Sequence, residues 1–187
     1  MQRRTFSQML AALPLLAFGC RSIAGPVSSL KEIDDMQKNW KALLADNAEV
    51  AAGPTPPLTL ANAEWKKKLN AAAYNVLREE GTEYSGSSPL NNEKRAGVFA
   101  CAGCNLPLFT SAMKYDSGTG WPSFFTSIPG VFGTTTDYKL IYPRTEYHCA
   151  RCGGHHGHIF NDGPQPTGLR YCNNGVALRF IPKSGKA

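Results

Sequence analysis

The run CARCGGHHGHIFNDG at residues 149–163 combines a Cys-x-x-Cys element with three of the four histidines of the chain. A matching element, from Cys101 to Cys104, lies earlier in the sequence. Small residues, Ala102 and Gly103, separate the thiols of the earlier element, and two glycines, Gly153 and Gly154, follow the later one. Two such pairs are typical of a closed tetrahedral site, and thiolates are the soft ligands that zinc accepts. Because four thiolates leave no open position for a substrate, Cys101, Cys104, Cys149 and Cys152 predict one structural zinc ion per chain.

Two other interpretations of these thiols stay open at this stage. The four cysteines could form paired disulfides if the protein works in an oxidising compartment. A Cys-x-x-Cys element can also be redox-active, but that use favours a βαβ context, which the surrounding sequence does not offer. The zinc interpretation therefore accounts best for the two pairs.

Beyond Gly97 the sequence consists of short β-prone runs separated by Gly, Pro, Asn and Asp, and no long helical period returns. We expect strands at Val98 to Ala100, Leu108 to Phe109, Tyr138 to Tyr142 and Val176 to Ile181. This pattern predicts a mainly β fold, in which antiparallel β-sheets pack as a compact domain, preceded by short N-terminal helices. The domain is expected over residues 59–183, with a tail at 184–187.

An amphipathic helix is expected before the domain, because apolar residues recur at steps of three and four in residues 30–44. Ser29 and Glu32 would form its capping box. The apolar stripe could pack on the domain or on a partner. The Pro-rich run Gly53 to Pro57 then predicts a stiff linker, so that residues 25–58 form a helical extension.

Two short helices should open the domain itself. Trp65 and Leu69 indicate the first, and Asn70 could cap the second, which carries Tyr74 and Leu77 and which Gly81 would end. A larger helical contribution is not expected.

The first 24 residues resemble an export signal. Arg3 and Arg4 precede an apolar run, Met9 to Gly19, that is far shorter than the ~20 residues of a membrane helix. The adjacent arginines favour the twin-arginine route, although an ordinary secretory leader is the alternative. Cleavage before Gly25 is expected, and a loose lipoprotein box ending at Cys20 competes with it. The protein is thus predicted to be exported and periplasmic.

The formal charge of +6 exaggerates how basic the mature protein would be. Three of the 20 Lys and Arg residues lie in residues 1–24, which leaves 17 against 14 Asp and Glu. A surplus of this size, spread along the chain, gives no basic face and no recognisable nucleic-acid module. We therefore expect no nucleic acid among the partners.

Cys172 is the thiol that remains once the four predicted ligands and Cys20 are set aside. A lone Cys in a strand is commonly a small buried hydrophobe. However, Arg170 and Asn174 would share its face if this stretch is extended. A guanidinium near a thiol favours the thiolate, which is the nucleophilic form. Cys172 is therefore a candidate nucleophile.

Three histidines, His155, His156 and His158, directly follow the second cysteine pair. Loop histidines can be ordinary surface residues or metal ligands. A zinc ion beside them would hold such a loop rigidly, as a general acid requires. Trp121 lies on a Gly-flanked turn at residues 118–124, where it could be either a core aromatic or the wall of a pocket.

Four runs, taken in order, resemble the signatures of B-type methionine sulfoxide reductases: Gly81-Thr82-Glu83, residues 115–124, residues 152–160 and Arg170-Tyr171-Cys172. The resemblance covers roughly Asn62 to Pro182 and does not extend to Pro26–Pro57. It implies that Cys172 attacks the sulfoxide sulfur and becomes a sulfenic acid.

The resemblance also implies a role for each neighbouring side chain. His155 and His158 would bind and protonate the departing oxygen, Asn174 would support them by a hydrogen bond, and His156 is not assigned. Trp121 would pack on the S-methyl group of the substrate, and Arg170 would support the thiolate.

The resemblance implies that the substrates are proteins containing methionine-R-sulfoxide. Thr119 stands where many members carry a recycling Cys, so an external thiol reductant, thioredoxin-like or other, is expected. Two alternatives remain: a zinc-ribbon-like binding module, in which Cys172 and the histidines are structural, and a reductase of free methionine sulfoxide.

Overall fold

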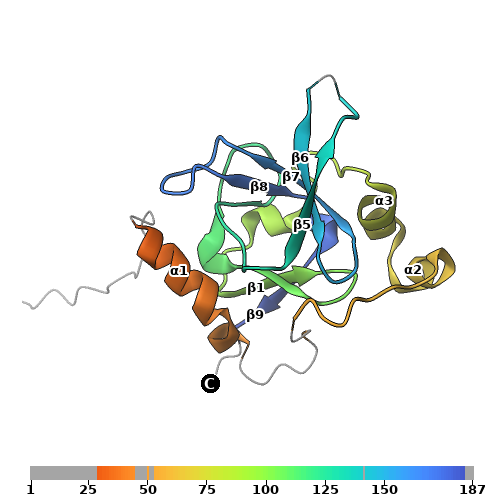
Figure 1. The fold of residues 1–187 in the computed structure, drawn as a ribbon, viewed down its shortest axis with the longest axis horizontal. Helices are drawn as coiled ribbons and strands as arrows, with labels where there is room; N and C mark the ends of the chain where they lie inside the picture. Colours follow the sequence, from red (N-terminus) through yellow and green to blue (C-terminus); the bar gives the residue numbers. More distant parts are fainter. Residues whose placement is uncertain (1–28, 45–49, 51–52, 141, 184–187) are drawn as a thin grey trace, which may run out of the picture.

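The computed structural model describes residues 29–44, 50, 53–140 and 142–183, and in it the chain forms two antiparallel β-sheets (Figure 1). One sheet has the strand order β2-β1-β9, and the other has the order β3-β4-β8-β7-β6-β5. The strands are β1 (Gly97–Cys101), β2 (Pro107–Thr110), β3 (Lys114–Tyr115), β4 (Ser123–Phe124), β5 (Phe132–Asp137), β6 (Arg144–Cys149), β7 (His155–Phe160), β8 (Arg170–Asn173) and β9 (Leu178–Pro182). The predicted mainly β fold is confirmed. The predicted export signal, Cys20 included, and the tail lie outside the described residues.

Short helices complete the structure and precede most of the strands. They are the α-helices α1 (Leu30–Lys38), α2 (Asn62–Lys68) and α3 (Ala71–Glu79), and the 3₁₀ turns η1 (Asn39–Leu43), η2 (Pro89–Asn92), η3 (Ser111–Met113) and η4 (Gly175–Ala177). No helix among the described residues is long and apolar enough to cross a membrane.

The core lies between the two sheets and is rich in aromatic rings. The Phe109 and Phe124 rings stack with centroids 3.9 Å apart, and Phe99 meets Phe124 edge-on at 5.1 Å. Strand β1 is buried along its whole length because its alternate side chains enter different clusters. Phe99 belongs to the main core, whereas Val98 and Ala100 face a smaller cluster.

The predicted amphipathic segment covers that smaller cluster. Leu44 packs on Val98 and Ala100, and Figure 1 shows α1 lying beside β1 and β9. The Gln37 amide donates hydrogen bonds to Thr126 Oγ1 at 2.7 Å and to the Ser127 carbonyl at 3.1 Å. The helix therefore packs on its own domain. Its predicted capping box between Ser29 and Glu32 is confirmed.

Helix α3 is capped by Asn70, whose side chain accepts from the Ala73 amide, as predicted. Its end differs from the prediction, because Glu80 and not Gly81 adopts the left-handed conformation, with φ of 55°. Gly81 is needed for another reason. A Cβ at this position would lie 2.2 Å from the Asn75 side chain.

Three strand predictions need correction. The described residues of the strand expected at 138–142 are not in a strand: β5 ends at Asp137 and β6 begins at Arg144, so Tyr138, Leu140 and Tyr142 lie at the tip of their hairpin. The run from Val176 starts as a 3₁₀ turn, and β9 begins at Leu178. The histidines lie on β7 and not on a loop. Gly157 allows this, because a Cβ there would lie 2.0 Å from the Cys172 carbonyl oxygen of the paired strand.

Candidate active site

Four cysteine sulfur atoms converge where the two Cys-x-x-Cys elements meet. All four lie within 4.8 Å of one another and are buried. Two of the distances are 3.7 Å, from Cys101 to Cys152, and 3.5 Å, from Cys104 to Cys149. A tetrahedral zinc ion with Zn–S bonds of about 2.3 Å would place its sulfur ligands about 3.8 Å apart. These distances are far longer than a disulfide bond of about 2.05 Å. The cluster therefore fits the predicted structural zinc ion and does not fit the disulfide alternative.

The two elements fold in the same way. The amide of Cys101 donates to the Leu106 carbonyl, and the amide of Cys149 donates to the Gly154 carbonyl, both at 2.8 Å. The turns need left-handed residues, which are Asn105 and Gly153, with φ of 58° and 67°. One element follows β1 and the other joins β6 to β7. Zinc thus ties the smaller sheet to the strand that carries the histidines.

Cys172 lies directly opposite His158 across the antiparallel pair of β7 and β8. On the other side of β8 it pairs with Ser123, and beyond β7 His158 pairs with Glu146. Residues directly opposite each other in a sheet project on the same face. The sheet register thus brings the predicted nucleophile and one predicted acid together. Cys172 is partly exposed.

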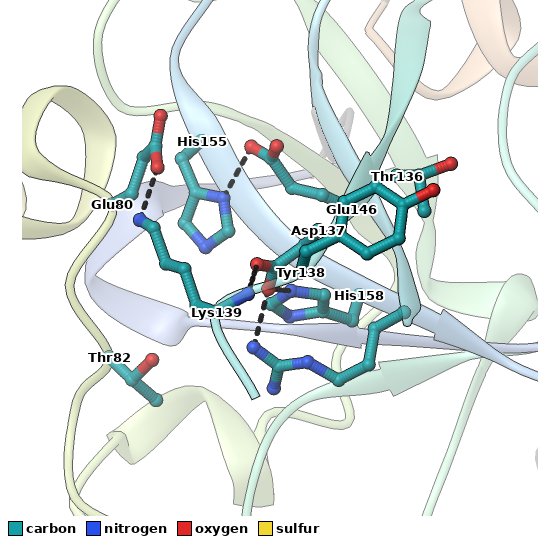
Figure 2. Close-up of a pocket in the computed structure, with 10 residues that line it drawn as sticks. Glu80, Thr82, Thr136, Asp137, Tyr138, Lys139, Glu146, His155 and His158 are labelled. Atoms are coloured by element: carbon teal, nitrogen blue, oxygen red, sulfur yellow. Dashed lines mark hydrogen bonds and ion pairs between the residues drawn. The ribbon is translucent and has the colours of Figure 1, made fainter. Parts of the chain in front are cut away.

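A carboxylate holds each of the two predicted catalytic imidazoles (Figure 2). His155 Nδ1 lies 2.7 Å from Glu146 Oε1, and Thr135 donates a hydrogen bond to the other oxygen of this carboxylate at 2.7 Å. His158 Nε2 lies 2.7 Å from Asp137 Oδ2. A carboxylate acceptor fixes the protonated nitrogen of the ring, so each histidine has a defined tautomer and orientation.

The His158 pair is extended by a cation. Arg144 reaches the same Asp137 oxygen at 2.5 Å. A backbone hydrogen bond from Lys139 and the side-chain bonds from His158 and Arg144 hold the pKa of Asp137 well below its usual range. Burial lowers the pKa of His158, while the Asp137 carboxylate acts in the opposite direction. Asp137 therefore stays ionised and stabilises the protonated form of His158.

Trp121 and Asn174 are held by the same loop. Trp121 Nε1 donates to the Glu83 carbonyl at 3.2 Å, and the Glu83 amide donates to Asn174 Oδ1 at 3.0 Å. Asn174 Nδ2 donates to the His156 carbonyl at 3.0 Å. Asn174 lies just beyond the end of β8, where it caps η4. These bonds fix the Trp121 ring as one wall of the pocket.

Arg170 is anchored away from the solvent. Its guanidinium makes two hydrogen bonds to the Asp162 carboxylate, at 2.7 and 2.8 Å, and lies 4.3 Å from the centroid of the Phe160 ring. Burial raises the pKa of the Cys172 thiol, while the charge of Arg170 and hydrogen bonds from Thr119 and Arg170 oppose this rise. Arg170 therefore limits the cost of forming the thiolate without bringing the pKa of Cys172 below its usual value.

Thr119 belongs to a group of hydroxyls next to Cys172. Thr119 Oγ1 and Ser117 Oγ are 2.8 Å apart, and Ser117 Oγ and Ser123 Oγ are 2.7 Å apart. Ser123 is fully buried. The position that the resemblance associates with a recycling thiol thus carries a hydroxyl, which acts against the rise in the pKa of Cys172.

The candidate active site opens as a pocket of about 140 Å³. Its lining residues are Thr82, Trp121, Arg144, Gly157, His158, Phe160, Cys172, Asn173 and Asn174. A larger cavity of about 380 Å³ shares Thr82, Arg144 and His158 with it and also contains His155 (Figure 2). All predicted site residues except Arg170 and the zinc ligands line one of these two spaces. His156 lines neither and is fully buried between aromatic rings.

Asp137, Arg144 and Glu146 did not stand out in the sequence. Arg144 and Glu146 are charged and lie two positions apart, shortly before Cys149. Because side chains two positions apart in a strand lie on the same face, this spacing indicates a strand with one polar face. It does not reveal which histidine each charge faces.

Comparison with known proteins agrees with this geometry. Residues 69–182 match the SelR domain family. Peptide methionine sulfoxide reductase B1, chloroplastic, of Arabidopsis thaliana is 40% identical over 164 residues, which cover 87% of this chain and 81% of that protein. The peptide methionine sulfoxide reductase MsrB of Agrobacterium fabrum is 45% identical over 129 residues, 68% of this chain and 96% of that protein. The MsrB protein of Pseudomonas putida is 49% identical over 123 residues, 65% and 92% respectively.

The fold, the cysteine cluster and these relatives define the class of the protein as a zinc-containing oxidoreductase. More specifically, the chain belongs to the SelR family, that of the B-type peptide methionine sulfoxide reductases. This finding excludes the zinc-ribbon-like binding module. The expectation that the resemblance stops short of Pro26–Pro57 is corrected. The alignment with the plant protein spans 164 residues, which is longer than the domain at 59–183 and its tail together, so it reaches into the segment before the domain.

Proposed function

We propose that the protein reduces methionine-R-sulfoxide in oxidised proteins through attack of the Cys172 thiolate on the sulfoxide sulfur. The thiolate, the sulfoxide and one proton become a cysteine sulfenic acid and a methionine thioether. The sulfur–oxygen bond of the substrate breaks as the oxygen passes to Cys172, whose sulfur is oxidised while the methionine sulfur is reduced. Such chemistry would make the enzyme a repair activity in the response to oxidative stress.

The placement of Cys172 opposite His158 supports this proposal most strongly. With Nε2 bound to Asp137, Nδ1 is the His158 nitrogen that remains uncommitted. Nδ1 must therefore donate the proton to the sulfoxide oxygen, and this requires a His158 ring that is protonated on both nitrogens. His155, fixed by Glu146, would bind the same oxygen, and Trp121 would receive the S-methyl group. The zinc ion, when bound, stabilises this arrangement and takes no part in the chemistry.

A direct assay tests the proposal. Purified protein is given a peptide containing either the R or the S epimer, and also free methionine-R-sulfoxide. We expect turnover of the R peptide, much slower turnover of the free amino acid, and none of the S epimer. Cys172→Ser should abolish turnover while retaining fold and zinc, because a hydroxyl is a far poorer nucleophile than a thiolate. Substantial activity of Cys172→Ser would assign another nucleophile.

The proposal includes an external thiol as the reductant. Among the described residues, the other cysteines belong to the zinc cluster, and Thr119 stands at the position that the resemblance associates with a recycling thiol. A small dithiol or a thioredoxin-like protein would then attack the sulfenic acid. Comparing both as reductants at equal thiol concentration distinguishes them.

The proposed location is the periplasm, reached by the twin-arginine route. The support is the pattern of residues 1–24, where Arg3 and Arg4 precede a short apolar run. Replacing both arginines by lysine should retain the enzyme in the cytoplasm, and undiminished periplasmic activity would favour the ordinary secretory route. Mass spectrometry of the mature N-terminus distinguishes cleavage before Gly25 from lipidation at Cys20.

A further inference from the structure

Exposed apolar side chains gather around the candidate active site. Among the described residues the large exposed ones are Leu30 (69% exposed), Tyr84 (89%), Tyr138 (76%), Leu140 (59%) and Tyr142 (77%). Single exposed apolar residues are normal on a protein surface, but a group of them beside a pocket marks an interaction site. Only Leu30, on α1, lies elsewhere.

Two segments carry this group and flank the site. Tyr84 follows Glu83, whose carbonyl holds Trp121, and precedes Ser85, which donates to the Thr119 carbonyl at 2.9 Å. Tyr84 therefore lies on the segment that holds the Trp121 wall of the catalytic pocket. Tyr138, Leu140 and Tyr142 lie at the tip of the β5–β6 hairpin, and Tyr138 lines the larger cavity. We call Tyr84, Tyr138, Leu140 and Tyr142 the aromatic rim.

The hairpin is attached across the larger cavity. Lys139 forms an ion pair with Glu80 at the end of α3, as Figure 2 shows. Arg144, the first residue of β6, pairs with Asp137 next to the tip. These two contacts hold the tip near the segment that leads to Tyr84. Tyr138 thus lines a cavity that shares Thr82, Arg144 and His158 with the catalytic pocket, and the other rim residues lie on the same two segments.

The size of the two spaces indicates what the rim contacts. The catalytic pocket, about 140 Å³, suits one oxidised methionine side chain, whereas the adjoining cavity of about 380 Å³, which contains His155, extends well beyond the space that one such side chain needs. Its lining is rich in charged and hydroxyl groups, which can bind the amide groups of a polypeptide backbone. Tyrosine rings offer a large contact area at a low cost in side-chain entropy.

We propose that the aromatic rim binds apolar side chains next to the oxidised methionine, so that the enzyme selects sulfoxides in extended, apolar segments of damaged proteins. This inference rests on the proposed function, because it places the sulfoxide itself at Cys172. Tyr138 lines the larger cavity, which adjoins the pocket that receives the sulfoxide, and this favours the substrate over the reductant as the occupant of the rim. Methionine sulfoxides flanked by apolar residues become accessible when a damaged protein partly unfolds.

The test compares two peptides with the same R-sulfoxide, one flanked by leucines and one by serines, with N-acetyl-methionine-R-sulfoxide as the small substrate. The quantity measured is the ratio of kcat/KM for each peptide to that for the small substrate. The variants are Tyr84→Ser and the double variant Tyr138→Ser with Leu140→Ser. Leu30→Ser is the matched control, since it removes an equally exposed apolar side chain from α1.

For the leucine-flanked peptide the ratio should fall roughly threefold to tenfold in each rim variant, as expected for partial burial of one or two apolar side chains. The ratio for the serine-flanked peptide should change less than twofold, and Leu30→Ser should match the unaltered enzyme. Equal ratios for the two peptides in every variant would overturn the proposal. A change confined to the KM of the reductant would also overturn it and assign the rim to that partner.

A binding measurement keeps this test separate from catalysis. The fluorescence anisotropy of a labelled, leucine-flanked sulfoxide peptide is followed on Cys172→Ser protein, with and without the rim substitutions. The rim substitutions should weaken binding by the same threefold to tenfold. If the enzyme reduces no sulfoxide but the rim substitutions still weaken peptide binding, the proposed function is wrong while the aromatic rim remains a peptide-binding surface. Equal peptide affinities with and without the rim substitutions would show that the rim does not bind the peptide, whether or not the enzyme reduces sulfoxides.

Discussion

His158 Nε2 lies 2.7 Å from Asp137 Oδ2, and Arg144 reaches the same carboxylate oxygen from the facing strand of the β5–β6 hairpin. Asp137 therefore links the predicted acid to the hairpin that borders the larger cavity. It does not touch the pocket that contains Cys172, so we regard it as a positioning residue. Its carboxylate orients the His158 ring and raises its pKa against the effect of burial.

Asp137→Asn should slow sulfoxide reduction roughly tenfold to hundredfold near neutral pH, because a positioned acid loses both its orientation and part of its protonated population. The sign of the pH effect follows from charge. Removing the carboxylate lowers the pKa of His158, so the fall in kcat/KM with rising pH should move to lower pH. Asp34→Asn on α1 is the control. An unchanged pH profile would show that Asp137 has only a structural role.

Zinc should be bound at one ion per chain and should be needed for stability, because the cluster ties β1 to the turn before β7. Cys149→Ser should release zinc and lower the Tm by about 10 °C or more. Cys172→Ser should keep one zinc and a nearly unchanged Tm. Metal analysis and thermal unfolding of both variants measure this. A metal-free, fully active protein with two disulfides would contradict the zinc assignment.

His156 should make the protein sensitive to acid. The ring is fully buried, neither nitrogen makes a hydrogen bond of good geometry, and burial lowers its pKa from 6.5 to about 4. A histidine with a lowered folded-state pKa binds protons preferentially in the unfolded state, so the free energy of unfolding falls as pH drops below 6.5. The loss amounts to about 2 kcal/mol at pH 5 and about 3 kcal/mol below pH 4.

His156→Leu should therefore be more stable than the unaltered protein, and the difference should grow between pH 7 and pH 5. Denaturant unfolding at both pH values measures it. Acid also releases zinc, but that loss affects both proteins and cancels in the comparison. His148→Leu provides the control, because this histidine is not fully buried. A difference that is independent of pH would show that the ring keeps its proton affinity in the folded protein.

The parts of the structure that depend on local spacing were predictable. The zinc ligands follow from two Cys-x-x-Cys elements, and the α3 cap follows from Asn70. Residues 138–142 were wrongly predicted as a strand because β-branched and aromatic residues favour strands wherever they occur, whereas only tertiary contacts decide which of them are paired. The strand β7 was not predicted, because the run 153–163 contains several glycines, which more often mark a loop.

The partners within the site could not be predicted in this way. The register of β6, β7 and β8 pairs His158 with Cys172 and Glu146, and the His158 side chain reaches Asp137 at the end of β5, 21 positions earlier in the chain. A shift of one residue in any pairing would turn the side chains to the other face. The register is set by the packing of the whole sheet, and no single motif contains it.

Cys172 should be regenerated by direct attack of an external thiol on its sulfenic acid, without an internal disulfide. Among the described residues every other cysteine belongs to the zinc cluster, and Thr119 carries a hydroxyl at the position that the resemblance associates with a recycling thiol. Oxidising the enzyme with one equivalent of substrate, then trapping with a sulfenic-acid reagent, should give an adduct on Cys172 with the zinc ligands unmodified. Thr119→Cys provides the matched comparison. A thiol at this position should form a disulfide with Cys172 and abolish trapping. A stoichiometric disulfide between Cys172 and another cysteine of the unaltered chain would refute direct recycling.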